Sequence, residues 1–228
     1  VHGSRGLGDV YKRQVLEHYS HFGKEFMQIT TIEGLRAKIG SPHPSTETKK
    51  YTALNQEALE FINASPFLVM TTSSSAHNLD ASPKGDQPGF VIAEDNKTLL
   101  IPDRPGNKLA DGHLNILDNP TIGLIFFVPN TRETLRINGS AELIDDADVL
   151  HRLAARGRPA LLATRVKIEE CFFHCGKALI RSKIWQPESW PEKGNVSFGK
   201  MFVKRSDADP KIAALVDAEI EKDYQENL

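Results

Sequence analysis

The spacing of apolar residues predicts a helix just before Phe67 and a different type of structure after it. The apolar residues of this helix recur at i, i+4, i+7 and i+8, namely at Leu54, Ala58, Phe61 and Ile62. That spacing forms one stripe on a helix. Ser65-Pro66 ends the run, because a residue before proline disfavours helical backbone. We expect the stripe to lie against a β core.

Shorter signals upstream predict an N-terminal arm over residues 15–50. Thr30 and Glu33 have the spacing of a capping box, which starts a short helix. Gly40, Pro42 and Pro44 then end it. Residues 1–14 lack an initiator Met and are rich in glycine and charge, so we interpret them as a non-native leader.

From Phe67 onward, short runs of strand-forming residues alternate with polar turns. The predicted strands are Phe67–Thr72, Leu79–Ser82, Gly89–Ala93, Thr98–Pro102, Thr121–Val128, Thr134–Ile144 and Ala163–Cys175. Six or seven antiparallel strands with few helices favour a small barrel within a mainly β, α+β domain over residues 51–190.

In two of these strands, the order of apolar and polar residues also predicts which residues share a face. In Thr134–Ile144 one face is apolar and the other polar; the apolar face holds Leu135, Ile137, Gly139, Ala141 and Leu143. In the last strand the apolar phase switches between Ile168 and Cys171, which predicts a β-bulge near Glu169-Glu170.

Three further helices are predicted. One spans Lys108–Leu117, with Leu109, His113, Ile116 and Leu117 on one stripe, and another lies near Asp146–Ala155. Residues 191–228 form a C-terminal extension that is polar until an amphipathic helix, whose stripe is Ile212, Leu215, Val216 and Ile220.

Composition excludes several classes of function. The chain has 28 basic and 30 acidic residues and 7% aromatic residues, so neither nucleic acid nor an anionic membrane is an expected partner. The longest apolar stretch, Ile122–Val128, is too short to cross a membrane. Cys171 and Cys175 would lie too far apart on one strand for a disulfide. A reducing, cytoplasmic location is therefore expected.

The segment Thr98–Lys108 predicts an anion site, because a strand runs through a tight turn into a helix N-terminus. Arg104 and Lys108 would add charge-assisted hydrogen bonds to a phosphate. The alternative is an ordinary type II turn at Pro105-Gly106, with Asn107 capping the helix.

The segment Ala81–Phe90 contains two prolines and two glycines, which remove backbone groups from strand pairing. Those groups near Lys84 and Gly85 could bind the polar edge of a flat heteroaromatic ring, with Asp86 holding the loop. A plain wide hairpin loop is the alternative.

Together these segments resemble the FMN-binding pyridoxamine 5′-phosphate oxidase-like proteins, and most closely their subgroup of FMN-dependent enzymes. The matching motifs are Ser82–Asp86, Gly89–Val91, Leu99–Lys108, Asn115-Ile116, Phe126–Pro129, Glu133–Gly139 and Cys171–Trp185. The resemblance runs from about Ala64 to Phe198.

The resemblance implies a six-stranded antiparallel split β-barrel with flanking helices, which forms a homodimer and holds each FMN between its subunits. It places Arg104, Asn107 and Lys108 at the phosphate, and Ser82, Lys84 and Gly85 at the isoalloxazine ring. It also directs Arg136 toward the same groove, and Arg181 and Trp185 toward the flavin. These nine residues are the predicted cofactor site.

Two of these assignments have structural alternatives. Arg136 could be a surface ion-pair partner. The segment Lys177–Trp185 could be a short helix with Arg181 in solvent and Trp185 packed inward. The C-terminal arginine and histidine pattern of authentic pyridoxamine 5′-phosphate oxidases is not found, so vitamin B6 oxidation is not expected.

Two other groups of residues resemble a metal site and a nucleophilic site. Cys171, His174 and Cys175 are close in sequence, but strand alternation would point His174 away from both cysteines, so no metal site is predicted. His113 with Asp111 or Ser82 lacks a strained nucleophile turn, and a partly buried helix histidine is the better interpretation.

The expected function is an FMN-dependent oxidoreductase that acts on an unidentified small molecule, with a nicotinamide nucleotide or oxygen as redox partner. No catalytic residue is assigned, because the flavin itself carries the redox chemistry. The alternatives are a non-catalytic flavin-binding or sensor protein on the same barrel, and a barrel adapted to haem or a deazaflavin.

Overall fold

A computed structural model describes residues 28–192, 194, 196–206 and 208–227. The interpretation of residues 1–14 as a leader concerns residues outside this part of the chain. Contacts divide the chain into two units, Val1–Glu47 and Thr48–Leu228, and each is described by itself.

In the first unit, helix α2 spans Ile32–Ile39 and ends at Gly40, as predicted; Gly40 has a φ of 77°. The predicted N-cap at Thr30 is wrong by one residue. Thr31 is the N-cap, because its side-chain oxygen accepts a hydrogen bond from the Gly34 amide at 3.0 Å. A 3₁₀ helix, η2, follows at Pro44–Lys49.

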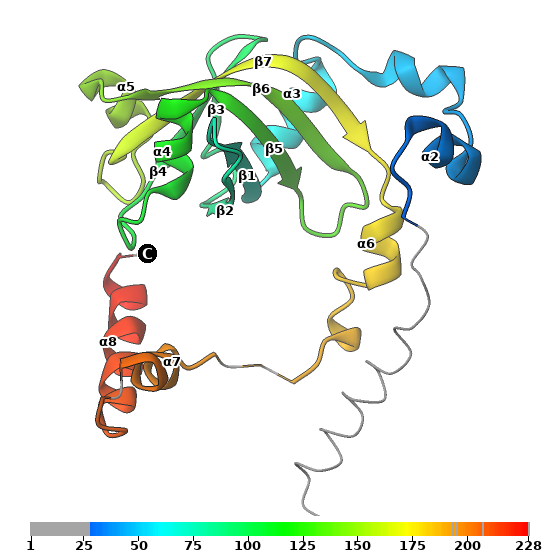
Figure 1. Cartoon of the computed structure of the whole chain (residues 1–228). Helices are drawn as coiled ribbons and strands as arrows, with labels where there is room; N and C mark the ends of the chain where they lie inside the picture. Colours follow the sequence, from blue (N-terminus) through cyan, green and yellow to red (C-terminus); the bar gives the residue numbers. More distant parts are fainter. Residues whose placement is uncertain (1–27, 193, 195, 207, 228) are drawn as a thin grey trace, which may run out of the picture. The chain divides into compact units, whose positions relative to one another are not determined.

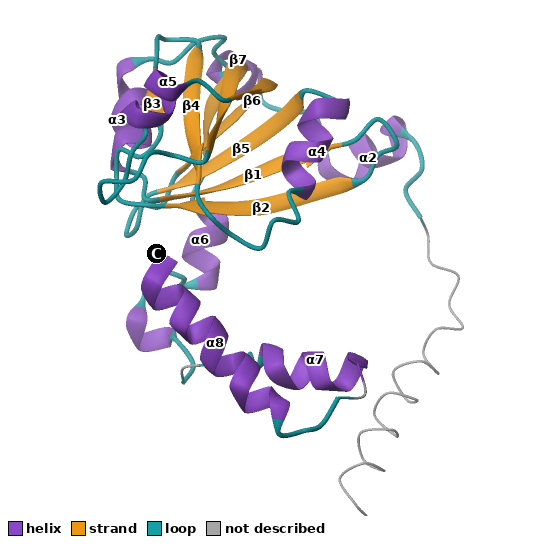
Figure 2. Cartoon of the chain, turned by 90° about the vertical axis from the view of Figure 1, so that its left-hand side faces the viewer, coloured by secondary structure: helices purple, strands orange, loops and turns teal. Residues whose placement is uncertain are grey.

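The second unit is built on a seven-stranded antiparallel sheet with the strand order β2-β1-β5-β6-β7-β4-β3 (Figure 2). Its strands are β1 (Phe67–Ser73), β2 (Leu79–Gly85), β3 (Ile92–Ala93), β4 (Thr98–Asp103), β5 (Thr121–Phe127), β6 (Thr134–Ile144) and β7 (Leu162–His174). The α+β class and antiparallel pairing are confirmed. All seven strands expected from the sequence pattern are present, one more than the six that the resemblance implies, and closure into a barrel stays a prediction.

Helices α3 (Gln56–Ala64) and α4 (Asp111–Asp118) contribute to one core with the sheet (Figure 1). Ala58 and Ile62 of α3 and Ile116 of α4 are buried together with Leu68 and Phe126 of the sheet. A second cluster contains Leu100 of β4 together with Leu150, Leu153, Ala160 and Ala163, around helix α5 (Ala147–Arg152). Strand β4 is therefore covered on both faces.

The predicted bulge in β7 is confirmed. Asn138 pairs with Glu170 and Gly139 pairs with Ile168, which leaves Glu169 without an opposing residue. A Cβ atom at Gly139 would lie 2.0 Å from the Lys167 carbonyl oxygen, so only glycine fits at the bulge.

Helix α4 begins three residues later than predicted, at Asp111 instead of Lys108. His113 and Ile116 do lie toward the interior, but Leu109 and Leu117 are 64% and 72% exposed. The apolar stripe expected from sequence was thus only half correct, and residues 104–110 form a longer loop before the helix.

Beyond the sheet lie α6 (Lys177–Ser182), η3 (Pro187–Ser189), α7 (Phe198–Ser206) and α8 (Ile212–Asn227). The predicted C-terminal helix is α8, whereas α7 lies in the stretch before Ile212, for which no helix was predicted. Helices α7 and α8 touch closely, since a Cβ atom at Gly199 would lie 1.9 Å from the Ala213 carbonyl oxygen. No helix in the described part of the chain is long and apolar enough to cross a membrane.

Candidate functional site

A cavity of about 610 Å³ lies between β2, the loop after β4 and the start of α4. That volume is within the range of protein pockets for small organic ligands. Its walls are formed by Met70, Asp80, Ser82, Pro83, Lys84, Asp103, Arg104, Gly106, Asn107, Lys108, Leu109, Ala110, Asp111, Gly112, His113, Leu161 and Leu162.

Strand alternation explains why three polar side chains of β2 point into this cavity. Asp80, Ser82 and Lys84 stand opposite the buried residues Thr72, Met70 and Leu68 of β1, so they share the inner face of the sheet. Helix α4 approaches this face closely. A Cβ atom at Gly112 would lie 2.8 Å from a carboxylate oxygen of Asp80, which explains the need for glycine there.

The centre of the cavity is an ion pair between Lys84 and Asp103. Their side chains are only 17% and 18% exposed. Beside this pair, the Ser82 hydroxyl donates a hydrogen bond to Asp80 at 2.7 Å. Two carboxylates and one ammonium group therefore meet in a space that is largely shielded from solvent.

His113 faces the same ion pair. Its Nε2 atom lies 3.7 Å from Oδ1 of Asp103, the oxygen that Lys84 also contacts. This nitrogen is buried and has no hydrogen-bond partner among the described residues. Burial lowers the pKa of His113, although the nearby Asp103 and Asp80 carboxylates favour its charged form; Lys84 adds to the lowering. The lowered pKa favours the neutral form of the imidazole.

The mouth of the cavity is the loop 104–110, which the sequence predicted as an anion site. Lys108 and Ala110 adopt the left-handed conformation with φ of 62° and 57°. Gly106 does not have the positive φ that the central position of a type II turn requires, so that alternative is wrong.

The first turn of α4 has no side-chain cap, which leaves its amide groups available to a ligand. Asn107 does not cap this helix, because its side chain accepts a hydrogen bond from the Leu109 amide at 3.0 Å. Lys108 is exposed and forms no ion pair with any residue of the described ranges.

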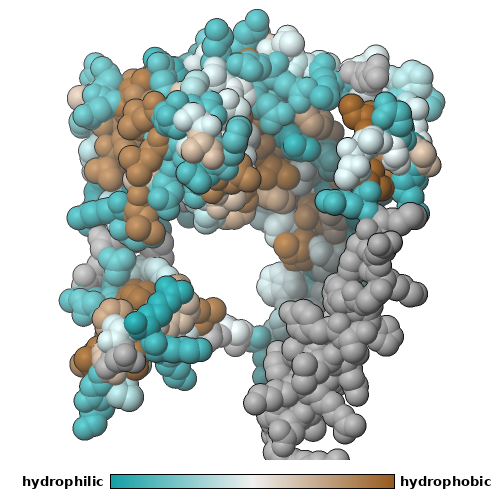
Figure 3. All heavy atoms as spheres, in the orientation of Figure 1, coloured by the Kyte–Doolittle hydropathy of each residue, from teal (hydrophilic) through white to brown (hydrophobic). Residues whose placement is uncertain are grey.

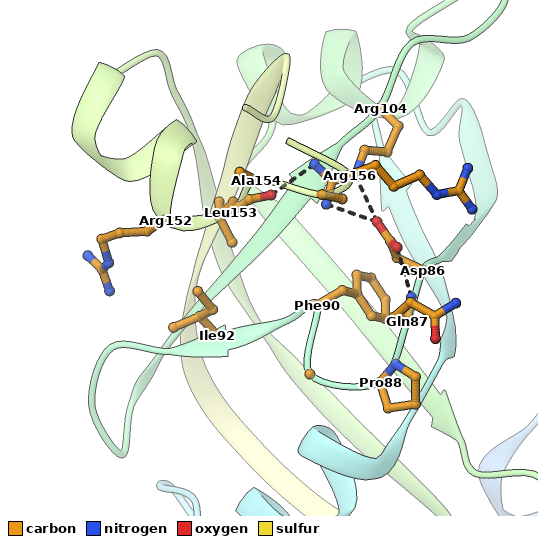
Figure 4. Close-up of a pocket in the computed structure, with 12 residues that line it drawn as sticks. Asp86, Gln87, Pro88, Phe90, Ile92, Arg104, Arg152, Leu153, Ala154 and Arg156 are labelled. Atoms are coloured by element: carbon orange, nitrogen blue, oxygen red, sulfur yellow. Dashed lines mark hydrogen bonds and ion pairs between the residues drawn. The ribbon is translucent and has the colours of Figure 1, made fainter. Parts of the chain in front are cut away.

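Arg104 is positioned differently from the expectation. Its Nε and Nη2 atoms each lie 2.9 Å from Asp86, and its Nη1 atom donates to the Leu153 carbonyl at 2.9 Å (Figure 4). Asp86 also accepts a hydrogen bond from the Gln87 amide at 2.8 Å, so it holds its loop as predicted. The guanidinium group thereby ties the loop after β2 to the end of α5.

The same contacts line a smaller pocket of about 230 Å³ around Phe90, Arg104 and Arg156. Arg152, which also borders this pocket, extends away from its centre in Figure 4 and lies 3.5 Å from Glu94. A third pocket of about 210 Å³ includes Gly85, Lys84 and Arg104.

The structure thus brings six of the nine predicted residues to neighbouring pockets; these are Ser82, Lys84, Gly85, Arg104, Asn107 and Lys108. The predicted interruption of β2 is wrong, because Lys84 and Gly85 still pair with Leu68 and Phe67. Pro83 is tolerated because β2 is an edge strand, whose outer side has no partner strand.

Arg136 does not point into this groove within one chain, contrary to the sequence-based expectation. It stands opposite Ile125 and Phe172, on the sheet face that Ser82 and Lys84 do not share. Its guanidinium carbon lies 5.3 Å from the centre of the Phe172 ring, and Lys50 approaches the same ring at 5.5 Å. A role of Arg136 in cofactor binding stays a prediction that would need a second subunit.

Arg181 and Trp185 also lie apart from the three pockets. Arg181 is exposed on α6, and the Trp185 indole donates to the Thr131 carbonyl at 3.0 Å. A Cβ atom at Gly176 would lie 2.4 Å from the Arg132 carbonyl oxygen, so α6 begins tightly against the β5–β6 turn. In the single chain these residues have the structural role that was the alternative interpretation.

Sequence reasoning missed Asp80 and Asp103 and discounted His113. Asp80 could have been found from the i, i+2 spacing with Ser82 on one strand. The contact between Asp103 and His113 depends on the path of the loop between them, which no periodicity encodes.

Comparison with known proteins gives one informative match. The family model for pyridoxamine 5′-phosphate oxidase matches residues 54–175, more than half of the 228-residue chain. A search of curated proteins found no match.

Three similar solved structures illustrate the range of relatives. HupZ from Group A Streptococcus is 18% identical, with a TM-score of 0.43 over 53% of this chain and 93% of its own. A protein of the pyridoxinephosphate oxidase family from Clostridium acetobutylicum is 15% identical, with a TM-score of 0.41 over 52% and 86%. An FMN-binding protein from Syntrophomonas wolfei is 10% identical, with a TM-score of 0.40 over 62% and 95%.

The matched region begins at Leu54 beside α3 and ends at Cys175 after β7. It therefore contains the whole sheet, helix α4 and all residues that line the 610 Å³ cavity. The chain belongs to the pyridoxamine 5′-phosphate oxidase family.

Proposed function

We propose that this protein is an FMN-dependent oxidoreductase that acts on a small molecule and holds the FMN phosphate at the mouth of the 610 Å³ cavity. The observation that carries the proposal is the uncapped first turn of α4, with Lys108 beside it and Lys84 inside the cavity. Free amide groups, a helix N-terminus and ammonium groups are a common combination for binding a phosphate.

The surroundings of the cavity fit an amphiphilic ligand. Besides its cations, the cavity is lined by Leu109 and Leu161, which are 64% and 60% exposed. Leu114 and Leu117 of α4 are exposed nearby, and Figure 3 shows apolar groups at the surface where α4 and β4 lie. A ligand with a phosphate beside the cations and a flat ring over the leucines would contact both the charged and the apolar lining of the cavity.

Within this proposal, the residues of the cavity have distinct roles toward FMN. Bound FMN would supply hydride transfer, so the protein needs to bind, orient and shield the reacting groups. Lys108 and the α4 amides would hold the phosphate. Lys84, inside the cavity, would lie between the phosphate and the ring, where its charge attracts the phosphate and favours the reduced, anionic form of a flavin. Arg104 would act indirectly, by fixing the loop through Asp86.

A homodimer is part of the proposal. The outer face of the sheet carries a row of apolar side chains that are exposed or only partly buried; they are Phe67, Val69, Ile125, Phe127 and Phe172. Covering this face with a second copy would bury apolar area and would bring Arg136 to an interface. Both free thiols, Cys171 and Cys175, agree with the proposed cytoplasmic location.

Lys108→Ala tests the phosphate assignment. We expect FMN affinity to fall by roughly tenfold, because a charge-assisted hydrogen bond contributes about 1.5–3 kcal/mol and Lys108 is exposed. The matched control is Lys167→Ala, an exposed lysine on β7 that lines none of the three pockets. Equal FMN affinity in the two variants would remove Lys108 from the site.

The catalytic part of the proposal needs a separate test. Purified protein with FMN would be mixed with reduced nicotinamide nucleotides in the absence of oxygen, and the flavin absorbance would be followed. An oxidoreductase predicts bleaching by at least one donor. Bound flavin that no donor reduces would favour the non-catalytic, sensor alternative.

A further inference from the structure

We propose that the 610 Å³ cavity binds a tetrahedral dianion together with one proton, and that His113 holds this proton against Asp103. The inference rests on the proposed function only for the identity of the natural dianion, the FMN phosphate. The proton comes from solvent, and no bond in the ligand is made or broken.

The first observation is that one oxygen of Asp103 serves two neighbours. Lys84 contacts Oδ1, and the buried Nε2 atom of His113 lies 3.7 Å from the same oxygen. That distance is too long for a hydrogen bond, and Nε2 has no other partner. A buried polar atom without a partner is unusual in a folded protein, and a state in which Nε2 bonds Asp103 would satisfy it.

The second observation is the charge around His113. The groups that face it from other elements are Lys84 and Asp80 on β2 and Asp103 at the end of β4. On the α4 side, the cavity is also lined by Asp111, Lys108 and Arg104. From strand β1, the uncharged side chains of Met70 and Thr72 lie close to this end of α4. Asp80 accepts a hydrogen bond from Ser82, and Arg104 is paired with Asp86. Lys84, which is paired with Asp103, and the exposed Lys108 are therefore the cations that a ligand in the cavity would meet.

These contacts define an exchange of partners. A dianion that enters the cavity attracts the Lys84 ammonium group, which weakens its contact with Asp103. The negative charge of Asp103 is then less neutralised by Lys84. Because this charge faces His113, it favours the protonated form of the histidine. The Nε2–H group can donate to Oδ1 after a movement of well under an ångström.

Linkage gives the consequence for affinity. If the bound state holds one more proton than the free state, the dianion binds more tightly as the pH falls. The affinity for the dianion then rises by up to about tenfold for each unit by which the pH falls. This holds in the pH range where His113 is neutral in the free protein and protonated in the complex.

The test follows the ring proton signals of the eight histidines by NMR while the pH is varied. The signal of His113 is identified by its absence in His113→Gln. Titrations are compared for the free protein, with saturating sulfate, which stays a dianion in this range, and with saturating FMN. His151 on α5 is the internal control, because it lies outside the cavity.

We expect both ligands to raise the pKa of His113 and to leave that of His151 unchanged. In the ligand-free protein, Lys84→Met should raise the pKa of His113 as well, and Asp103→Asn should abolish most of the rise caused by ligands. An unchanged His113 pKa at saturation would overturn the proposal, as would a full rise in Asp103→Asn. A response to sulfate without FMN binding would reject FMN and leave the proton coupling intact.

Discussion

Two cation–carboxylate pairs lie side by side in this molecule and are satisfied to different degrees. Arg104 and Asp86 are 27% and 18% exposed and share two close contacts, and the Leu153 carbonyl accepts a further hydrogen bond from the arginine. Lys84 and Asp103 are 17% and 18% exposed, yet their neighbour His113 retains a buried nitrogen without a partner.

In the proposed function, the difference separates a structural pair from one that meets the ligand. A guanidinium group in a complete network holds two loops together and has little left to offer a ligand. An ammonium group is a compact point charge on a flexible stem, and it can exchange one anionic partner for another. The sequence alone placed Arg104 at the phosphate together with Asn107 and Lys108, and it did not predict the pairing of Arg104 with Asp86.

The largest effect is expected when the Arg104–Asp86 pair is broken, and it is a loss of folding stability. Arg104→Ala should lower the free energy of unfolding by about 2 kcal/mol, because Asp86 and the Leu153 carbonyl both lose their partner in a poorly solvated position. Urea unfolding measures the change. Arg152→Ala is the control, since this side chain is 49% exposed and only 3.5 Å from Glu94; we expect a loss of less than about 0.5 kcal/mol. Equal losses would contradict a structural role for Arg104.

A smaller loss is expected for the second pair. Lys84→Met should lower the free energy of unfolding by about 1 kcal/mol, because His113, whose Nε2 atom lies 3.7 Å from Asp103, can replace the lysine as a partner of the carboxylate. The same urea experiment applies. A loss greater than that of Arg104→Ala would mean that the Lys84 pair, and not the Arg104 pair, holds this region together.

The smallest effect concerns His113. Replacing it by leucine should leave the free energy of unfolding unchanged or raise it by up to about 1 kcal/mol near neutral pH, because an unsatisfied buried nitrogen is removed. Unfolding by urea at several pH values would show it. A clear loss of stability at neutral pH would indicate that the histidine makes a favourable contact in the folded protein.

The folding stability of the same variant should also depend on pH differently from that of the wild type. Burial lowers the pKa of His113 below its ordinary value of 6.5, so the unfolded chain binds more protons than the folded chain just below that value. Wild-type stability should therefore fall as the pH falls through 6.5 toward the folded pKa. His113→Leu should lack this part of the decrease, and parallel curves for the two proteins would contradict the lowered pKa.

Local patterns predicted most of the fold. The phase switch between Ile168 and Cys171 gave the bulge at Glu169, because strand alternation is a property of neighbouring residues. The start of α4 was missed because Leu109 continues the helical spacing, although its backbone precedes the helix and its side chain is exposed. The α7 helix was missed because its apolar residues stand among lysines and glycine.

The candidate site was predictable only in part. The loop residues were found because a strand, a turn and a helix start follow one another directly in sequence. The phase of Arg136 on its strand was correct, but which face of the sheet meets α4 depends on strand pairing across the whole domain. The partnership of Asp103 with Lys84 and His113 joins three elements, and no single segment encodes it.

The most direct test of the central claim compares FMN with riboflavin, which has the same ring system without the phosphate. Equilibrium binding would be measured for the full chain by flavin fluorescence. The phosphate site proposed at Lys108 and the start of α4 predicts that FMN binds at least about tenfold more tightly than riboflavin, and that Lys108→Ala removes most of the difference. Equal affinity for the two flavins, or no binding of either, would contradict the account.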